Sequence, residues 1–149
     1  MRLTQKTDLA LRALIALAAC YPELSTVSDM ARALGVSANH LMKSVQSLRR
    51  AGFVDSARGY AGGHRLCRAP HDIRIGDVVR ALEDVALVEC FRDADACVLT
   101  PRCSLAGALR RAADAFLAQL DGVTLADISG ARTVALLRLR PHATSLEAL

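Results

Sequence analysis

The fold of this chain is decided by residues 25–51, Ser25-Thr-Val-Ser-Asp-Met-Ala-Arg-Ala-Leu-Gly-Val-Ser-Ala-Asn-His-Leu-Met-Lys-Ser-Val-Gln-Ser-Leu-Arg-Arg-Ala51. Small polar residues at the start of this stretch cap a short amphipathic helix, which Gly35 ends. Ser37 caps a second helix, whose inward residues recur at steps of four and three. Those inward residues are Leu41, Val45 and Leu48. Two helices joined by so short a turn are typical of a helix-turn-helix.

Further elements are expected on both sides of this pair. Before it, a helix is expected from Thr4 or Thr7 to Cys20, with a threonine as its cap. After it, two short alternating stretches flank a glycine-rich loop, and they predict a hairpin that forms a wing. The strands are expected over residues 53–56 and 64–67, and later helices over residues 73–82, 103–121 and 125–128. The sequence therefore predicts a mainly α fold, a winged helix-turn-helix with a small two-stranded β wing.

The composition fits a helical chain with a core of small aliphatic residues. Hydrophobic residues make up 52% of the 149 residues and aromatic residues only 3%, with no Trp. The five cysteines are an odd number, which excludes a fully paired set of disulfides within one chain. No stretch approaches the length of a membrane span, so we expect a cytoplasmic protein with reduced thiols and no membrane partner.

The positive charge of the chain is concentrated in one region. Residues 37–68 hold six basic side chains against a single acid, Asp55, whereas residues 69–149 hold nine basic and eleven acidic ones. A local basic surface is what a protein that binds double-stranded DNA presents to the phosphates. The alternative is a helical hairpin with an ordinary solvated face.

Candidate DNA contacts follow from the faces of these elements. The start of the second helix, which enters the major groove in helix-turn-helix proteins, turns Asn39, His40 and Lys43 outward. Asn can pair with adenine and Lys can donate to guanine, whereas Ser37 is better placed for a phosphate. On the wing, Arg58 and Arg65 are expected to reach phosphates or a minor groove.

A second candidate site is the cysteine segment, residues 89–103. Cys90, Cys97 and Cys103 lie in a polar stretch broken by Pro101, where thiols are not needed for packing. Three soft ligands on such a segment indicate iron–sulfur or zinc chemistry, although their spacing is neither that of a zinc ribbon nor that of a ferredoxin. They could also be loop cysteines without a ligand. Asp8 could add a carboxylate ligand, or be only a charge at the start of a helix.

Several stretches together resemble iron–sulfur winged-helix regulators of the NsrR and IscR kind. They are Met1-Arg-Leu-Thr-Gln-Lys-Thr-Asp-Leu-Ala-Leu-Arg-Ala-Leu14, Val36-Ser-Ala-Asn-His-Leu-Met-Lys43, Leu48-Arg-Arg-Ala-Gly-Phe-Val54, Arg58-Gly-Tyr-Ala-Gly-Gly63 and Ile73-Arg-Ile-Gly-Asp-Val-Val-Arg80. The run Leu99-Thr-Pro-Arg-Cys103 is most similar to the nitric-oxide-sensing NsrR branch. The resemblance extends over residues 1 to about 129.

The resemblance implies a homodimer with a long C-terminal dimerisation helix and a [4Fe-4S] or [2Fe-2S] cluster held by Cys90, Cys97 and Cys103. It also implies a repressor that leaves palindromic operator DNA when nitric oxide attacks the cluster. Asp8 matches the fourth ligand of some NsrR-type members, given by the partner subunit, whereas the IscR-type histidine would fall at Ala106. We expect a DNA-binding domain over residues 1–85 and a cluster-binding and dimerisation region over residues 86–129. Residues 130–149, with Pro141 and small polar residues, are expected to form a poorly ordered tail that the resemblance does not cover.

Three other functions stay open at this point. The same fold could sense iron supply or redox state instead of nitric oxide. A thiol or zinc regulator without iron is a second alternative, and an enzyme with a cysteine nucleophile is a third. An enzyme would need a base near a thiol, and no histidine lies beside the cysteine segment in the sequence. We therefore expect no enzymatic activity.

Overall fold

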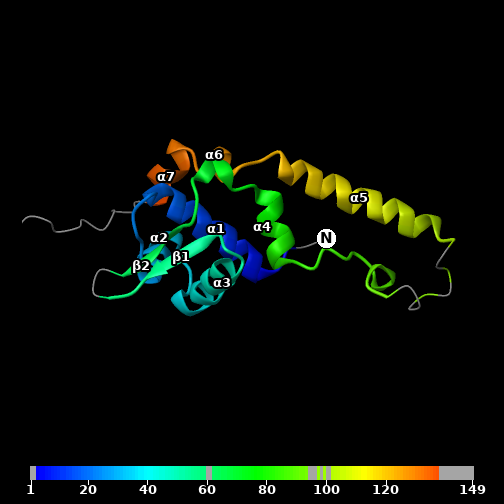
Figure 1. Cartoon of the computed structure of the whole chain (residues 1–149), viewed down its shortest axis with the longest axis horizontal. Coiled ribbons are helices and arrows are strands. Elements are labelled where there is room, and N and C mark those ends of the chain that lie inside the picture. The colour runs from blue at the N-terminus through cyan, green and yellow to red at the C-terminus, as the bar shows by residue number, and fades with distance from the viewer. Residues whose placement is uncertain (1–2, 60–61, 94–96, 98, 100–101, 138–149) are drawn as a thin grey trace, which may run out of the picture.

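The computed structural model describes residues 3–59, 62–93, 97, 99 and 102–137. The molecule is elongated (Figure 1). Its elements in chain order are α1 (Gln5–Cys20), α2 (Val27–Leu34), α3 (Ala38–Arg50), β1 (Val54–Ala57), β2 (Gly63–Leu66), the 3-10 turn η1 (Pro70–Asp72), α4 (Ile75–Leu82), the 3-10 turn η2 (Glu89–Phe91), α5 (Ser104–Asp121), α6 (Leu125–Ile128) and α7 (Ala131–Leu137). The mainly α winged helix-turn-helix predicted from the sequence is confirmed.

The helix-turn-helix forms for the reasons that its sequence suggests. The side chain of Thr26 caps α2 by accepting the N–H of Asp29 at 3.1 Å. At the other end, Gly35 takes a left-handed conformation (φ 64°), which costs glycine little. The N–H of Val36 then returns to the carbonyl of Ala31 at 3.0 Å, so the chain turns at once into α3.

The core lies where α1 crosses the helix-turn-helix. The side chains of Leu14, Leu17, Met30, Leu41 and Leu48 are all fully buried there. A hydrogen bond also joins the two helices that pack most closely, because the buried hydroxyl of Ser44 on α3 donates to the carbonyl of Lys6 on α1 at 3.0 Å. Helix α1 therefore sets the position of α3.

The wing is a two-stranded antiparallel sheet, in which Val54 pairs with Leu66 and Ala57 with Gly63. Both strands agree with the prediction to within one residue. The sheet also contacts the start of the helix-turn-helix, because Ser25 and His64 exchange two backbone hydrogen bonds of 2.8 Å. A Cβ at Gly63 would lie only 2.9 Å from the carbonyl oxygen of Ser25. The wing therefore needs glycine at this position.

Helix α4 begins at Ile75, two residues later than predicted. The reason lies outside the helix: the N–H of Ile75 donates to the carbonyl of Val123, and the N–H of Leu125 donates to the carbonyl of Ile73. Residues 73–75 thus pair as extended backbone with the segment between α5 and α6. This pairing brings residues 73–75 next to residues 123–125, and local periodicity could not predict it.

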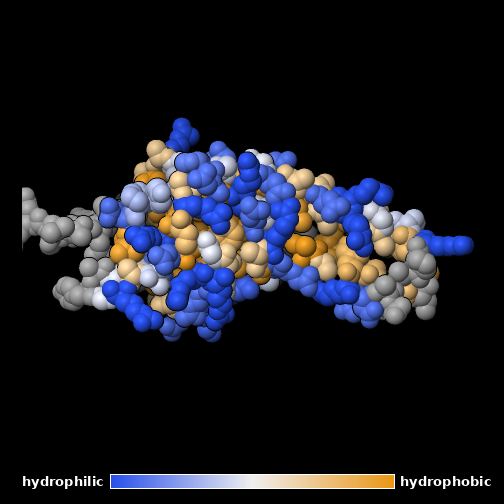
Figure 2. Space-filling model, viewed as in Figure 1, coloured by the Kyte–Doolittle hydropathy of each residue, from blue (hydrophilic) through white to orange (hydrophobic). Residues whose placement is uncertain are grey.

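Helix α5 projects away from the rest of the molecule (Figure 1). Only Ala113 and Leu117 are buried along it, and Leu105 near its start is 65% exposed. Apolar side chains are accordingly visible on the surface around α4 and α5 in Figure 2. None of the helices in the described part of the chain is both long and apolar enough to cross a membrane.

The last described residues correct one expectation. Residues 131–137 form α7, whose Leu137 is buried in the core, whereas the sequence suggested a poorly ordered tail from Gly130. Burial of one large aliphatic side chain stabilises such a short helix, and the sequence pattern did not predict it. Residues 138–149 of that expected tail lie outside the described residues.

Candidate metal centre and nucleic-acid interface

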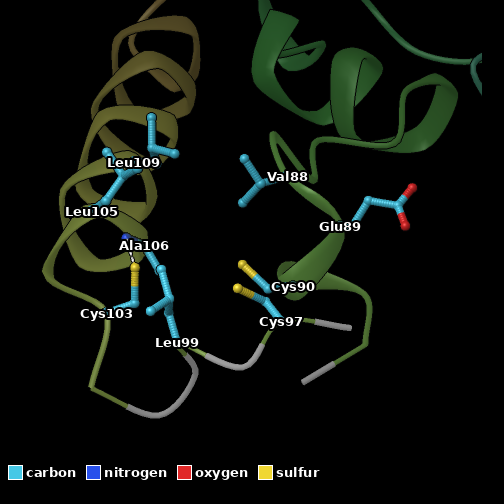
Figure 3. Close-up of a pocket in the computed structure, with 9 residues that line it drawn as sticks. All are labelled: Val88, Glu89, Cys90, Cys97, Leu99, Cys103, Leu105, Ala106 and Leu109. Atoms are coloured by element: carbon cyan, nitrogen blue, oxygen red, sulfur yellow. Dashed lines mark hydrogen bonds between the residues drawn. The ribbon is translucent and has the colours of Figure 1, made fainter. Parts of the chain in front are cut away.

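The three cysteines of the segment line one pocket of about 270 Å³. Cys90 lies in η2, Cys97 follows in the loop, and Cys103 precedes α5. Figure 3 shows the thiols of Cys90 and Cys97 pointing from the loop towards α5. The rest of the wall is mostly apolar. It consists of Val88, Glu89, Leu99, Leu105, Ala106 and Leu109.

Cys103 also caps a helix. Its Sγ accepts the N–H of Ala106 at 3.4 Å, so the sulfur faces the positive end of the α5 dipole (Figure 3). A helix that begins directly after a cysteine therefore fixes the direction of this thiol. Cys90 and Cys97 are held by less regular backbone. All three are partly accessible.

The donor set fits an iron–sulfur cluster. Thiolates are the usual ligands of such clusters, and an apolar wall limits access of water to them. In the described residues, no three His, Cys, Asp or Glu side chains converge as ligands of one metal ion.

Asp8 lies elsewhere in the same chain, in the first turn of α1. It is absent from the wall of the cysteine pocket, and its carboxylate forms an ion pair with Arg12 at 2.9 Å. Both side chains are about half exposed. A role for Asp8 as the fourth ligand thus requires a carboxylate from a second copy of the chain, as the resemblance implies.

Charged side chains hold the cysteine segment against the remaining fold. Arg92, two residues after Cys90, donates to Asp84 at 2.6 Å, and Asp84 also accepts the N–H of Ala86 at 2.9 Å. These bonds keep the pKa of Asp84 below its usual value, first through Ala86 and then through Arg92. On the other side, the guanidinium of Arg110 lies 4.6 Å from the ring centre of Phe91.

Glu83 connects this region to α1. Its Oε1 accepts both the backbone N–H of Thr4 at 2.6 Å and the hydroxyl of Thr4 at 2.8 Å. Burial raises the pKa of Glu83, but hydrogen bonds from Thr7 and Thr4 outweigh it, and the pKa falls below the usual value. The sequence did not predict a role for Glu83 or Asp84. Two adjacent acids at the end of a predicted helix were the only signal.

The candidate DNA contacts on α3 are exposed as predicted. Asn39, His40 and Lys43 all face solvent near the start of the helix. Ser37 occupies the N-cap position, yet its side chain makes no cap hydrogen bond. Its hydroxyl therefore remains available to a phosphate.

The two wing arginines differ from each other. Arg58 is exposed directly after the end of β1. Arg65 on β2 lies 3.5 Å from Asp55 on the neighbouring strand, a long contact between half-exposed groups. We expect DNA to compete easily for Arg65, because exposed ion pairs contribute little.

The remaining two cysteines lie apart from the cysteine pocket. Cys20 is buried at the end of α1, and burial followed by the nearby charge of Asp29 raises its pKa. Cys67 is exposed after β2, and burial of part of its side chain and the charge of Asp55 raise its pKa. A raised pKa leaves less reactive thiolate, so both fit the inert role expected for them.

Comparison with known proteins gives consistent results. The sequence profile of the Rrf2 family, described as an iron-dependent transcriptional regulator, matches residues 3–131. CymR of B. subtilis, the global cysteine regulator, is 30% identical with a TM-score of 0.69, over 87% of this chain and 96% of that one. T. potens IscR is 27% identical with a TM-score of 0.67, over 86% and 85%. The oxidised form of S. aureus CymR is 25% identical with a TM-score of 0.68, over 87% and 96%.

Proposed function

This chain belongs to the Rrf2 family of transcriptional regulators, and we propose that it is a nitric-oxide-sensitive iron–sulfur repressor. In this proposal it works in the cytoplasm and binds palindromic operator DNA as a homodimer. The observation that carries the proposal is the pocket shared by Cys90, Cys97 and Cys103. The family and its structural neighbours are regulators and not enzymes, which agrees with the absence of catalysis expected from the sequence.

In the proposed protein, Cys90, Cys97 and Cys103 hold the cluster, and Asp8 of the partner subunit completes its ligands. The bound cluster supplies iron that nitric oxide attacks. The ligands come from the loop, from the start of α5 and from the start of the partner's α1. Their joint position therefore depends on how the two subunits are packed.

The chain itself offers a short connection from the cysteine segment to α3. Arg92 holds the segment to Asp84, and the adjacent Glu83 accepts two hydrogen bonds from Thr4 at the start of α1. Two residues further along, the carbonyl of Lys6 accepts the hydroxyl of Ser44 on α3. A change in the cysteine segment can thus alter the start of α1 and, with it, the helix that faces DNA.

The energy needed for such a switch is modest. A dimer must present its two α3 helices at matched half-sites about one or more DNA turns apart. A drop in operator affinity of a hundredfold to a thousandfold corresponds to a coupling of roughly 3–4 kcal/mol. A few hydrogen bonds and a change in the angle between the subunits are sufficient for this.

The dimer is supported by exposed apolar side chains on α5 and in the loop before it. Leu105 is 65% exposed, Leu99 is 64% exposed, and Phe116 and Leu120 are only partly covered. A long helix with few buried residues gains stability when an apolar face packs against a second copy. Analytical ultracentrifugation should give a dimer, and a monomer at micromolar concentration would contradict this part of the proposal.

A second candidate is a sensor of iron supply or redox state with the same fold. The neighbour S. aureus CymR favours a redox response, because its structure is that of an oxidised form. T. potens IscR has a similar fold and a different name from the NsrR branch. Against an IscR-like ligand set, Ala106 lines the cysteine pocket where the resemblance would place a histidine. Titration of the loaded protein with nitric oxide and, separately, with an iron chelator distinguishes the two candidates through the loss of operator binding.

A further inference from the structure

The outward face of α3 continues well beyond the residues predicted to read bases. Asn39, Lys43, Gln46 and Arg50 recur at steps of four, three and four, which places them on one side of the helix. All four are exposed, and Arg49 is exposed beside them. The C-terminal half of α3 therefore presents polar and basic side chains in the same direction as the N-terminal half.

Arg49 and Arg50 differ in their surroundings from the arginines of the described residues that form ion pairs. No acidic residue occurs in α3, and no carboxylate within the described part of the chain pairs with either guanidinium. Five other arginines of the described residues have such a partner. Those pairs are Arg12–Asp8, Arg32–Asp29, Arg65–Asp55, Arg80–Asp121 and Arg92–Asp84. The positive charge at this end of α3 is thus left uncompensated by the protein.

Of the described residues, Gln46, Arg49 and Arg50 line a pocket of about 390 Å³. Figure 2 shows strongly hydrophilic atoms gathered over the position of α3. The charge of Arg49 also acts on the wing, because burial and then this arginine lower the pKa of His64 on β2. This basic surface is therefore close to both DNA-binding elements.

We propose that Arg49 and Arg50, aided by Gln46, bind phosphates of the operator that border the major groove beyond the bases faced by Asn39 and Lys43. The ligand is the DNA backbone, so this inference rests on the DNA binding in the proposed function. Guanidinium groups match phosphate oxygens in pairs, and the amide of Gln46 can add a hydrogen bond. The contact fixes the position of α3 in the groove and carries no sequence preference.

The alternative role of both arginines is structural. Cations in the last turn of a helix interact favourably with its dipole, and this would place them there without any ligand. The two roles predict different results when the charges are removed. If the role is structural, removal of the charges lowers only the free energy of unfolding. If the arginines contact phosphates, removal lowers the DNA affinity and its dependence on salt.

The test uses the full-length protein with Arg49→Gln, Arg50→Gln and the double substitution. Affinity is measured by fluorescence anisotropy over a series of salt concentrations, on a random-sequence duplex and on an operator selected by the wild-type protein. We expect each single variant to weaken binding to both duplexes by a similar factor. We also expect it to reduce the slope of log affinity against log salt by about 0.9 per lost contact.

Two matched variants complete the design. Arg50→Lys keeps a charge and should keep most of the salt slope, whereas Arg132→Gln removes an equal charge from the exposed face of α7 and should change nothing. Unchanged affinity and slope in the double variant, or a loss confined to one sequence, would overturn the assignment. A wild-type protein that binds neither duplex would contradict the proposed function itself.

Discussion

Arg80 and Asp121 join α4 to the end of α5 through two parallel contacts, with Nη1 2.6 Å from Oδ1 and Nη2 2.6 Å from Oδ2. Arg74 adds a third contact, since its Nη1 donates to the backbone carbonyl of Asp121 at 2.8 Å. Gly76 leaves the space for this carboxylate, because any Cβ there would collide with it. The position of α5 relative to the DNA-binding part is therefore set by side chains that both elements supply.

This ion pair predicts a stability that depends on pH. Hydrogen bonding from Arg80 lowers the pKa of Asp121, so the carboxylate stays charged to lower pH in the folded state than in the unfolded state. The contribution to the free energy of unfolding is complete above the usual Asp pKa of about 3.9, and it disappears as the pH falls through the lowered value. Thermal unfolding over a series of acidic pH values should show a smaller loss of stability for Asp121→Asn than for the wild type.

The control for this prediction is Asp77→Asn. Asp77 lies 3.8 Å from the same Arg80 guanidinium but without the parallel geometry. Its removal should therefore change the loss of stability at acidic pH less than removal of Asp121 does. Equal effects of the two substitutions would show that Asp121 has no special part in holding α5.

The cysteine ligands give a second prediction. Replacement of Cys90, Cys97 or Cys103 by Ser should abolish the cluster and give a protein that no longer represses, because each thiol lines the common pocket. Cys67→Ser is the matched control, since that thiol is exposed and lies outside the pocket. Iron and sulfide assays with a visible spectrum measure the result. A Cys90→Ser protein with a full cluster would remove Cys90 from the ligand set.

The origin of the fourth ligand can be tested with mixed dimers, provided that Asp8→Ala alone lowers the cluster content. A dimer of one Asp8→Ala chain and one Cys90→Ser chain should keep one site, because the intact cysteines meet the intact Asp8 of the other chain. A dimer of wild type with the doubly substituted chain should keep none. The opposite pattern would show that each chain supplies its own carboxylate.

Ala106 offers an independent check of the same ligand. It lines the pocket beside the three thiols, so a histidine introduced there is in reach of the metal. Ala106→His in the Asp8→Ala background should restore cluster content. Arg12→Gln serves as the comparison, because it removes only the ion pair with Asp8 and leaves the carboxylate in place. Loss of the cluster in Arg12→Gln would indicate that the ion pair matters more than ligation.

Glu83→Ala should weaken the link between the cluster and DNA without loss of the cluster. It removes the acceptor of two hydrogen bonds from Thr4, and with it the contact between the end of α4 and the start of α1. We expect the ratio of operator affinities before and after nitric oxide to shrink roughly threefold to tenfold, or about 0.5–1.5 kcal/mol. Asp127→Ala is the control, since Asp127 on α6 accepts the same two kinds of hydrogen bond from Thr124. An equal change in both variants would contradict the link.

Lys43→Ala should weaken operator binding while the cluster stays intact, because Lys43 is exposed on α3 and remote from the cysteine pocket. Competition between operator and random duplex measures the change in specificity. An affinity and a salt slope equal to those of the wild type would take Lys43 out of the interface.

Much of the fold could be predicted because its signals are local. The cap at Thr26, the glycine at position 35 and the spacing of Leu41, Val45 and Leu48 all lie within the helices that they specify. The start of α4 was misplaced because residues 73–75 pair with a segment some fifty residues later in the chain. Long-range backbone pairing leaves no periodic signal.

In the candidate site, too, the residues with local signals could be predicted, and those that depend on distant partners could not. The three cysteines are recognisable by residue type and by their polar surroundings, and they do share a pocket. The carboxylates of Glu83, Asp84 and Asp121 gain their roles only from partners such as Thr4, Arg92 and Arg80. Two of these partners lie many residues away, where sequence spacing gives no guidance. The fourth ligand depends on a second chain and stays a prediction.

The most direct test of the central claim is a titration of nitric oxide into protein purified without oxygen, followed by its visible spectrum and its operator binding together. We expect a brown protein with iron and sulfide, whose absorption near the violet end of the spectrum collapses at a few equivalents of nitric oxide as the operator is released. A brown protein that keeps both its spectrum and its operator, or a colourless one that binds DNA regardless, would contradict it.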